Sequence, residues 1–389
     1  MRKNVLIFGV GSLQRSIIET AKKKGFTTIG IDPNPVAECR ENVDFFEIVN
    51  PDDFEKTKEI ATKYKVDGIV TAATDKPLIM MARVAEEFNF PFFSVNTAER
   101  STDKLKMKQT FIENSIPCAS GIEINKANEY IGGFPVIIKP RDNSGSRGVI
   151  YCKNENELRN SFLDVKTHTR KETILVEEFI HGREFSVESF HNEDVHSVIQ
   201  ITEKETTPFP YNVELSHIQP ANIDEQTRSN IENIIEKIGE SFQFNHCPSH
   251  TELKISKNGA ITVIETSPRL GGDFITSHLV PLSTGIDMES LLLDIAVGKK
   301  MTEKEILPRA SMVNFFNIEQ KDLTEKFLEN IATLRTGKIV EDIYFSKSVG
   351  EILPKITNSL DRYGYFIISA ADGEKLKEKK EQILQFLIA

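Results

Sequence analysis

The chain has 389 residues, and its 48 lysines and arginines against 58 aspartates and glutamates give a formal net charge of −10. This length favours two or three domains, and the acidic balance argues against non-specific binding to nucleic acid or to an anionic membrane. The four cysteines form no CxxC pair, and the first apolar run, residues 5–10, is too short for a signal segment or a membrane span. We therefore expect a cytoplasmic protein with reduced thiols.

The first part of the chain alternates between expected strands and expected helices. Expected strands cover residues 5–9, 27–31 and 68–71. Expected helices cover about residues 13–24, 53–64 and 77–88. Such alternation favours a parallel sheet with right-handed crossovers, so we expect a Rossmann-like α/β domain here.

A partial dinucleotide fingerprint follows the first expected strand. Gly9 and Gly11 precede Asp32 by about twenty residues, as the fingerprint requires, but Gln14 replaces its third glycine. We therefore favour a scaffold without a nicotinamide cofactor, with an NAD-binding protein as an alternative.

Thr74 and Asp75 follow the third expected strand. Ligands of open α/β sheets collect at the carboxyl ends of the strands, which makes both residues candidate substrate contacts. Capping of the next helix is the alternative explanation.

Two lysines mark a change of pattern after residue 98. Lys104 lies in the first turn of an expected helix that either Thr102 or Asp103 would cap. Lys139 lies near the end of a buried strand at residues 134–140. A buried lysine in that place is unusual unless an anion compensates its charge.

A loop of small residues, 143–149, comes directly after Lys139. Ser144, Gly145, Ser146 and Gly148 would let backbone N–H groups approach a phosphate closely. The loop lacks the P-loop pattern, and a polar hairpin tip would also explain it; its place after Lys139 favours the phosphate.

A further strand, residues 174–180, is followed by a turn at Gly182 and an alternating run. Alternation places Glu184, Ser186 and Glu188 on one face of that strand. A solvated sheet face is the structural alternative to a ligand site.

An Asn258-Gly259 turn between two alternating runs predicts a β-hairpin. With Lys257 opposite Ala260 beside the turn, counting outward places Glu252 opposite Glu265. A register slip of one residue would break this argument.

Two carboxylates directly opposite each other repel, so a cation must compensate them. We favour Mg²⁺, which proteins bind through one or two carboxylates together with phosphates. Lys254, on the same face as Glu252, is the alternative partner. Arg269 follows closely and suits phosphoryl charge, and Gly271 and Gly272 suit a turn that approaches a ligand.

Together these segments resemble the ATP-grasp superfamily. Its order is a helix-start lysine, a strand lysine, a glycine-rich lid loop, a hinge strand with glutamates, a ribose glutamate, and paired metal carboxylates that close with E-x-N-x-R. The resemblance covers most of the chain. It implies a Rossmann-like pre-ATP-grasp domain at residues 1–97, an ATP-grasp domain at residues 98–300 with a mobile lid at about 120–178, and a small α+β C-terminal domain at residues 301–389.

The resemblance also implies a role for each matching residue. ATP would be bound through its phosphates by Lys104, Lys139, Ser144, Gly145, Ser146 and Gly148. Its adenine would be held by Glu177, Glu178, Phe179 and Ile180, and its ribose by Glu184. Mg²⁺, with Mn²⁺ as an alternative, would be bound by Glu252, Glu265 and Ser267. The catalytic residues would be Lys139 and Arg269, which stabilise the acyl-phosphate.

One of these positions departs from the family pattern, because Ser267 stands where a metal-site asparagine is usual. A hydroxyl is a weaker and shorter ligand than an amide carbonyl. We therefore expect a second metal ion to be held more loosely or through a water.

Two stretches resemble one branch of the superfamily, the L-amino-acid ligases and related carboxylate–amine ligases. Glu214 and His217, with Pro220-Ala221 after them, are similar to the branch's E-x-x-H…P-A segment, and residues 269–273 are similar to its R-x-G-G-D. The resemblance implies that Glu214, His217, Arg269, Gly271 and Gly272 lie near the substrates, as we also expect for Thr74 and Asp75. An exposed polar loop is the alternative for Glu214 and His217.

The last part of the chain shows expected strands at residues 311–316, 338–345 and 365–370, and an amphipathic helix at 373–387. We expect a small cap that covers the site or supports a homodimer. Nothing in this part has a catalytic pattern.

The function that the resemblance implies is an ATP-dependent ligase that activates a carboxylate as an acyl-phosphate and joins it to an amine. Its partners would be small molecules. The chain also resembles biotin-carboxylase-like and carbamoyl-phosphate-synthase-like ATP-grasp proteins. The alternatives are an ATP-grasp carboxylase that uses bicarbonate, a purine-pathway ligase, and a catalytically silent nucleotide-binding sensor.

Overall fold

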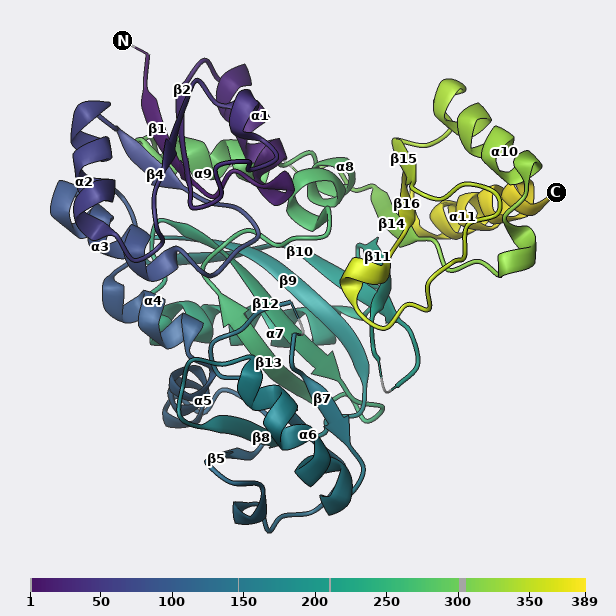
Figure 1. Cartoon of the computed structure of the whole chain (residues 1–389), viewed down its shortest axis with the longest axis horizontal. Coiled ribbons are helices and arrows are strands. Elements are labelled where there is room, and N and C mark those ends of the chain that lie inside the picture. Colours follow the sequence, from purple (N-terminus) through teal and green to yellow (C-terminus); the bar gives the residue numbers. More distant parts are fainter. Residues whose placement is uncertain (1, 146, 210, 301–305) are drawn as a thin grey trace.

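The computed structural model describes residues 2–145, 147–209, 211–300 and 306–389, and Figure 1 shows its three sheets. A parallel sheet lies at the N-terminal end, a long antiparallel sheet runs through the centre, and a smaller antiparallel sheet covers the residues expected to form the lid. The expected mixture of α/β and α+β architecture is confirmed. Among the described residues, no helix combines the length and the apolar character that a membrane crossing requires.

The N-terminal sheet has the strand order β3-β2-β1-β4, and every pair is parallel. Its strands are β1 Asn4–Phe8, β2 Thr27–Asp32, β3 Phe45–Ile48 and β4 Gly68–Val70. Its helices are α1 Arg15–Lys23, α2 Phe54–Lys63 and α3 Leu78–Phe88, with 3₁₀ turns at Ser12–Gln14 and Arg40–Asn42. Strand β3 was absent from the expectation, because it is a short edge strand whose apolar Phe45 and Ile48 are exposed.

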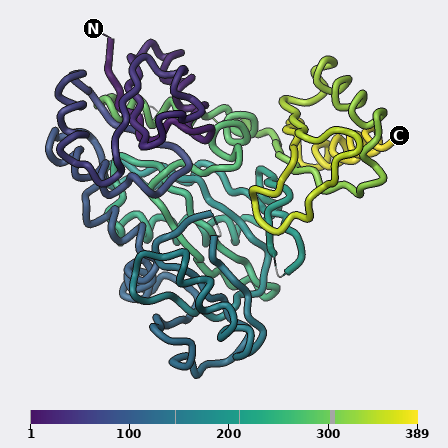
Figure 2. The backbone as a smooth tube through the Cα atoms, in the orientation of Figure 1, coloured from purple at the N-terminus to yellow at the C-terminus, as the bar shows by residue number. Residues whose placement is uncertain are grey.

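Helix α9, Met288–Ala296, returns from late in the chain to this sheet and packs against α1 and β4. Figure 2 shows this green segment beside the purple N-terminal part. Gly68 allows the close approach, since a Cβ there would lie 2.1 Å from the Ala296 carbonyl oxygen. The N-terminal sheet thus uses a helix from the range 98–300, and the domain boundaries stay predictions.

The central sheet has the strand order β13-β12-β9-β10-β11-β14-β16-β15, with antiparallel pairs throughout. Its first five members in chain order are β9 Arg183–Asn192, β10 Val195–Thr206, β11 Glu214–Gln219, β12 Cys247–Ile255 and β13 Ile261–Ser267. The helices around it are α4 Val95–Thr102, α5 Lys104–Glu113, α7 Glu225–Phe242, the π-helix Ile275–Leu279 and α8 Val280–Thr284. Asp103, and not Thr102, caps α5 by accepting from the Leu105 backbone N–H at 3.0 Å.

The predicted β12–β13 hairpin is present, but its turn is longer than expected. Ile255 pairs with Ile261, so the expected Lys257–Ala260 pair is wrong. A two-residue type I′ turn needs positive φ at both positions, and of Asn258 and Gly259 only Gly259 has it, at +84°. Residues 256–260 therefore form a loop closed by a hydrogen bond from Ser256 N to Ala260 O of 3.0 Å.

The C-terminal part continues the central sheet, because β14 pairs with β11. Its strands are β14 Ala310–Phe315, β15 Asp342–Phe345 and β16 Gly364–Ala370. Its helices are α10 Glu325–Thr336 and α11 Gly373–Ile388, with 3₁₀ turns at Gln320–Asp322 and Ser359–Asp361. The expected strands and the closing helix are confirmed, although β15 is shorter than predicted and α10 was not foreseen.

The lid sheet has the order β5-β8-β6-β7 and lies at the bottom of Figure 1. It comprises β5 Gly121–Ile124, β6 Val136–Lys139, β7 Ile150–Cys152, β8 Ile174–Glu178, helix α6 Glu155–Thr167 and a 3₁₀ turn at Ala127–Glu129. Ile138, Leu158 and Val176 belong to a separate apolar core of the lid. A separate core is what a unit that moves as one body requires, and the mobility of the expected lid stays a prediction.

Candidate active site

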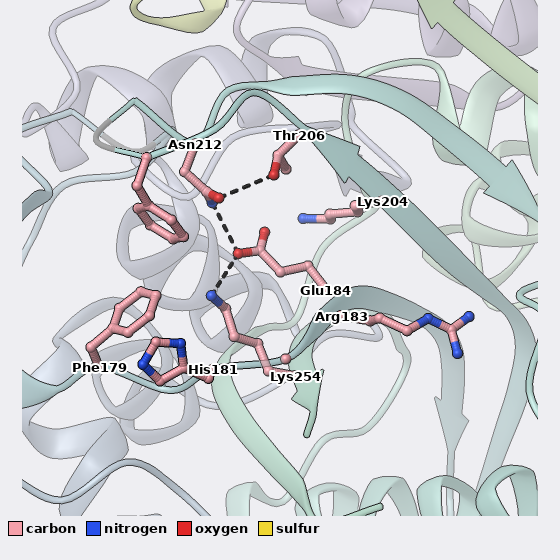
Figure 3. Close-up of a pocket in the computed structure, with 10 residues that line it drawn as sticks. Phe179, His181, Arg183, Glu184, Lys204, Thr206, Asn212 and Lys254 are labelled. Carbon is pink, nitrogen blue, oxygen red and sulfur yellow. Dashed lines mark hydrogen bonds and ion pairs between the residues drawn. The ribbon is translucent and has the colours of Figure 1, made fainter. Parts of the chain in front are cut away.

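A cavity of about 270 Å³ opens where the lid meets the central sheet (Figure 3). Glu184, on β9, lies within it and accepts from Lys254 Nζ at 2.7 Å and from Asn212 Nδ2 at 2.9 Å. Asn212 is itself fixed by a 3.1 Å hydrogen bond from Thr206. The full lining is Phe179, His181, Gly182, Arg183, Glu184, Lys204, Thr206, Phe209, Asn212 and Lys254. The cavity thus contains the predicted Phe179 and Glu184, together with residues that were not predicted.

Aromatic rings form one wall of this cavity. The Phe179 and Phe209 ring centroids lie 4.8 Å apart, and Tyr151 from β7 lies 4.8 Å from Phe179 and 5.1 Å from Phe209. Lys254 Nζ lies 5.0 Å from the Phe179 centroid. Such a wall suits the face of a flat base, because every base offers a π surface for stacking.

The two hinge glutamates point elsewhere in this structure. Glu177 is buried between Lys139 and Lys108, with Lys108 Nζ 2.8 Å away. Glu178 accepts from the Ser120 backbone N–H at 2.7 Å. Neither they nor Ile180 line the cavity, so the predicted adenine contacts of these residues stay a prediction.

The Lys108–Glu177–Lys139 cluster explains how Lys139 is held inside the protein. Both lysines have about 7% of their side chains exposed and share one carboxylate. Burial opposes the ionisation of Glu177, but the two ammonium groups outweigh it and lower its pKa. The cluster carries one net positive charge, which an anionic ligand would neutralise.

The loop 143–149 connects β6 to β7 in the lid. Gly145 and Gly148 have φ of +66° and +75°, a conformation that favours glycine. The Ser144 backbone N–H donates to Asn143 Oδ1 at 3.0 Å, and Ser146 lies outside the described residues. Phosphate binding by this loop stays a prediction.

Glu252 and Glu265 face each other across β12 and β13, as predicted. Each has a lysine partner: Lys204 Nζ lies 2.5 Å from Glu252, and Lys104, at the start of α5, pairs with Glu265. Burial disfavours the Lys204 ammonium, but Glu252 and Glu214 outweigh that effect and raise its pKa above the usual value. The alternative partner Lys254 pairs with Glu184 instead.

These carboxylates fit a hard divalent cation only in part. Among the described residues, no three His, Cys, Asp or Glu side chains are placed to hold a metal ion together. Two facing carboxylates with adjacent cations instead match a site completed by phosphate oxygens, which is how Mg²⁺ is usually held in nucleotide sites. The donor set therefore fits nucleotide-bound Mg²⁺.

Asp75, from the loop after β4, joins the N-terminal domain to this site. Its Oδ1 accepts from Ser267 Oγ at 2.5 Å and from Arg269 Nε at 3.0 Å. Burial opposes ionisation of Asp75, but Arg269 and Ser267 outweigh it and lower its pKa. Asp75 thus contacts Ser267 and Arg269, which follow Glu265 in the chain. Thr74 precedes Asp75 in the same loop, and a substrate contact of either residue stays a prediction.

Buried polar side chains of β9 and β12 contact the turn at residues 269–273. His250 donates to or accepts from Glu188 at 2.6 Å, and His250 Nε2 lies 3.5 Å from Glu252. A Cβ on Gly271 would lie 2.8 Å from Glu188 Oε2, so only glycine fits there, and Gly272 packs beside Ala73. Ser186 and Glu188 are fully buried, which removes the solvated-face alternative for this strand.

Glu214 and His217 lie on β11, next to β10. His217 pairs in register with Lys204, and Glu214 with Thr206, so both lie beside the cavity rather than on an exposed loop. His217 is 1% exposed, and neither ring nitrogen has a hydrogen-bond partner among the described residues. Such an orphaned buried ring is available to a ligand.

Side chains of the chain itself form hydrogen bonds with the partial dinucleotide motif. Gln14 Oε1 accepts from the Gly11 backbone N–H at 3.2 Å, while its Nε2 donates to Ala72 O at 2.7 Å. Asp32 accepts from the Val10 backbone N–H at 2.9 Å. These contacts occupy the groups that a pyrophosphate and a ribose would need, which agrees with a scaffold without NAD.

Residues 132–277 match the family model of the ATP-grasp domain. The chain contains an ATP-grasp domain. The matched region includes Lys139, Glu184, both paired carboxylates and Arg269, while Lys104 and Asp75 come from outside it.

Three similar proteins extend the ATP-grasp match to most of the chain. An alanine–anticapsin ligase of Bacillus subtilis is 25% identical over 268 residues, 62% of this chain and 56% of the ligase, so the chain spans little more than half of that relative. An N5-carboxyaminoimidazole ribonucleotide synthase of Staphylococcus haemolyticus is 23% identical over 342 residues, 82% of this chain and 84% of the synthase. The crystal structure of an L-amino acid ligase from Bacillus licheniformis superposes with a TM-score of 0.83 at 23% identity, covering 99% of this chain and 97% of the ligase. This last likeness establishes the fold.

Several residues of the candidate site were not predicted from the sequence. Lys204 carries a usable signal, since its strand alternates and places it beside Glu184. Asn212, Lys108 and the His250–Glu188 pair have no local pattern that separates them from ordinary polar residues. Arg362, which contacts Asp273, belongs to a part of the chain in which no site was expected.

Proposed function

We propose that this protein is an ATP-dependent ligase that joins a carboxylate to an amine through an acyl-phosphate, with release of ADP and phosphate. The observation that carries the proposal is the position of Lys204, which lines the aromatic-walled cavity and pairs with Glu252. It connects the aromatic-walled cavity to Glu252, one of the paired carboxylates. A pocket for the base, paired carboxylates for a metal ion with phosphates, and an arginine together match phosphoryl transfer to a small acid.

In this proposal the cavity receives the nucleoside part of ATP. Phe179 and Phe209 would stack on the base, and Glu184 would accept hydrogen bonds from the ribose hydroxyls. Lys254 and Asn212 already hold the Glu184 carboxylate at 2.7 and 2.9 Å, so it is oriented before the ligand arrives. Preorganised groups of this kind lose less entropy on binding.

The phosphates would then lie over the paired carboxylates. Mg²⁺ bound there by Glu252 and Glu265, with Mn²⁺ as an alternative, would neutralise the phosphate oxygens and help to hold them in line. Lys104 and Lys204 neutralise the same carboxylates in this structure. Both can turn to phosphate oxygens when nucleotide and cation arrive together.

The chemistry has two steps in this proposal. In the first step, a carboxylate oxygen attacks the γ-phosphorus, the bond from the γ-phosphorus to the β-phosphate oxygen breaks, and ADP leaves. In the second step, the amine attacks the acyl carbon, the bond from that carbon to the phosphate oxygen breaks, and phosphate leaves while the nitrogen loses a proton. Arg269 and Lys139 would stabilise the charge that develops on the phosphoryl group. The lid would exclude water, since hydrolysis of the acyl-phosphate would waste it.

The small-molecule substrates would lie between Asp75, residues 269–273 and β11. The unpartnered ring nitrogens of the buried His217 support a polar substrate group at this place. The alanine–anticapsin ligase and the L-amino acid ligase among the similar proteins support amino acids as the first substrates to test.

Phosphorylation of bicarbonate is a second candidate. The similarity to the N5-carboxyaminoimidazole ribonucleotide synthase spans more of both chains than the similarity to the alanine–anticapsin ligase, and it favours a carboxylating enzyme of purine metabolism. The two candidates share the nucleotide site and differ in the acid that attacks the γ-phosphorus.

The decisive experiment measures ADP and phosphate release with ATP and Mg²⁺ against amino acids, alone and in pairs, with bicarbonate in a separate reaction. Release that depends on particular pairs supports the ligase, and mass spectrometry of the product names them. Release with bicarbonate alone favours the second candidate. ATP binding without release under any condition would favour a silent sensor. Lys139→Ala and Glu265→Ala should abolish the release without unfolding the protein, and near-normal turnover in either variant would refute the proposed site.

A further inference from the structure

Residues 269–273, which carry Arg269 and the Gly271-Gly272 turn, are held from both flanking domains. Asp75 of the N-terminal domain binds Arg269. At the other end of the segment, Arg362 of the C-terminal part binds Asp273. The substrate-facing loop therefore lies between two interdomain ion pairs.

The Arg362–Asp273 pair has a fixed geometry. Arg362 Nη1 lies 2.8 Å from Asp273 Oδ2, and Nη2 lies 2.9 Å from Oδ1. The guanidinium carbon also lies 3.9 Å from the centroid of the Phe315 ring, and only 11% of the arginine side chain is exposed. A bidentate, stacked and largely buried arginine restricts its partner far more than an exposed ion pair does.

Arg362 reaches this place because its segment leaves the rest of the C-terminal part. It directly follows the 3₁₀ turn Ser359–Asp361. Asp361 accepts from the backbone N–H groups of Thr357 and Asn358 at 2.9 and 3.1 Å and so fixes the turn from within. The arginine is thus presented by an ordered segment.

The backbone that Arg362 holds is in a conformation that ordinary residues seldom adopt. Asp273 and Phe274 have φ of +48° and +66°, in the left-handed region. Consecutive non-glycine residues there persist only where surrounding contacts hold them. Asp273 Oδ2 also lies 3.6 Å from His217 Nε2, so the carboxylate stands beside this buried ring, whose nitrogens have no hydrogen-bond partner among the described residues.

We propose that Arg362 is a positioning residue of the active site: through Asp273 it fixes residues 269–273 and places Asp273 beside His217. The C-terminal part is then a component of the substrate site rather than a cover. The inference rests on the proposed function for what the loop binds, but the positioning itself concerns this chain alone.

The experiment compares Arg362→Gln, Arg362→Lys and Asp273→Asn with Lys380→Gln. Lys380 provides the matched control, because it also links the C-terminal part to the central sheet, by a 2.8 Å pair with Glu205 rather than with residues 269–273. Hydrogen–deuterium exchange of residues 270–276 measures loop order without any substrate. Steady-state kinetics with the substrates found for the wild-type protein measure the consequence.

We expect faster exchange at residues 270–276 in the three site variants and unchanged exchange in Lys380→Gln. With substrates, kcat should fall about 10- to 100-fold, as small misplacements of catalytic groups do, while KM for ATP stays within about twofold of the wild-type value. Arg362→Lys should not rescue, since an ammonium cannot form the bidentate pair.

Unchanged loop exchange in Arg362→Gln and Asp273→Asn, or the same increase in Lys380→Gln, would overturn the proposal. A rise of KM for ATP as large as the fall in kcat would also overturn it, because it would indicate a general loss of structure. If the wild-type protein turns over no substrate, the proposed function fails, while the exchange comparison still decides whether Arg362 positions the loop.

Discussion

Glu252 on β12 and Glu265 on β13 lie directly opposite each other although the turn between their strands is longer than the sequence predicts. Next to the turn, Leu253 pairs with Val263, one residue out of the predicted register. The register then shifts between Leu253 and Glu252, leaving Ile264 as an extra residue in a β-bulge. The bulge restores the facing carboxylates, and bulges often reorient side chains next to active sites in this way.

Removing one of these carboxylates should impair the reaction more than the fold. We expect Glu265→Gln to lower kcat at least about 100-fold, or ~2.7 kcal/mol of transition-state stabilisation, and to raise the Mg²⁺ concentration needed for activity. Rates measured across a Mg²⁺ titration test this. Glu99→Gln is the matched control, because Glu99 also pairs with a lysine of α5, Lys106, at 2.6 Å. Equal Mg²⁺ dependence in both variants would contradict the metal role.

The aromatic wall should contribute to nucleotide affinity. Phe209 is 42% exposed, so Phe209→Ala should leave the stability almost unchanged while raising the Kd for ATP about 10-fold, the loss of ~1–2 kcal/mol of stacking. Isothermal titration calorimetry measures this directly. Phe45→Ala on the edge strand β3, where the side chain is 46% exposed, serves as the control. If the Kd for ATP is the same in Phe209→Ala as in the wild-type protein, the base does not bind against this wall.

Asp75 should affect the reaction rate by holding the Arg269 side chain in place. Asp75→Asn weakens the pair to Arg269 and the contact to Ser267, so we expect kcat to fall about 10-fold or more with little change in ATP affinity. Asp67→Asn, which weakens an ion pair between Asp67 and Lys3 within the same domain, should leave kcat unchanged. A loss of stability without a change in kcat would show that Asp75 only holds the two domains together.

The interface between α1 and α9 should make stability depend on pH. Burial raises the pKa of Glu289 from its ordinary 4.5 to about 7, despite hydrogen bonds from Ser16 and Thr20. The folded protein then holds this proton more tightly than the unfolded chain. The free energy of unfolding should therefore fall as pH rises from about 4.5 to about 7, by roughly 3 kcal/mol, and stay level above that range.

The Glu289→Gln variant removes this titration. We expect it to be more stable than the wild-type protein at pH 8, by up to roughly 3 kcal/mol, and similar to it at pH 5. Urea unfolding at the two pH values measures the difference. Glu19→Gln, an exposed neighbour on α1, should retain most of the wild-type pH dependence. The same pH slope in Glu289→Gln and wild type would refute the assignment.

The sequence anticipated the parts of the site that lie on regular elements. Lys104 follows a recognisable helix cap, and Lys139 ends an apolar strand, so local patterns place both. Glu184 is fixed by alternation along one strand. In contrast, the expected adenine contacts of Glu177 and Glu178 concern side chains that here bind Lys108, Lys139 and a backbone N–H, groups far from them in the chain.

By itself, then, the sequence determined the order of the elements, the strand faces and the chemical kinds of side chain, because hydrophobic periodicity and capping act within a few residues. Only the tertiary structure decided which charges neutralise one another: Lys204 with Glu252, Asp75 with Arg269, and Arg362 with Asp273. Residues 89 positions apart meet in the last pair. Ion pairs between distant segments depend on how whole sheets and domains pack, and no local pattern along the chain records that.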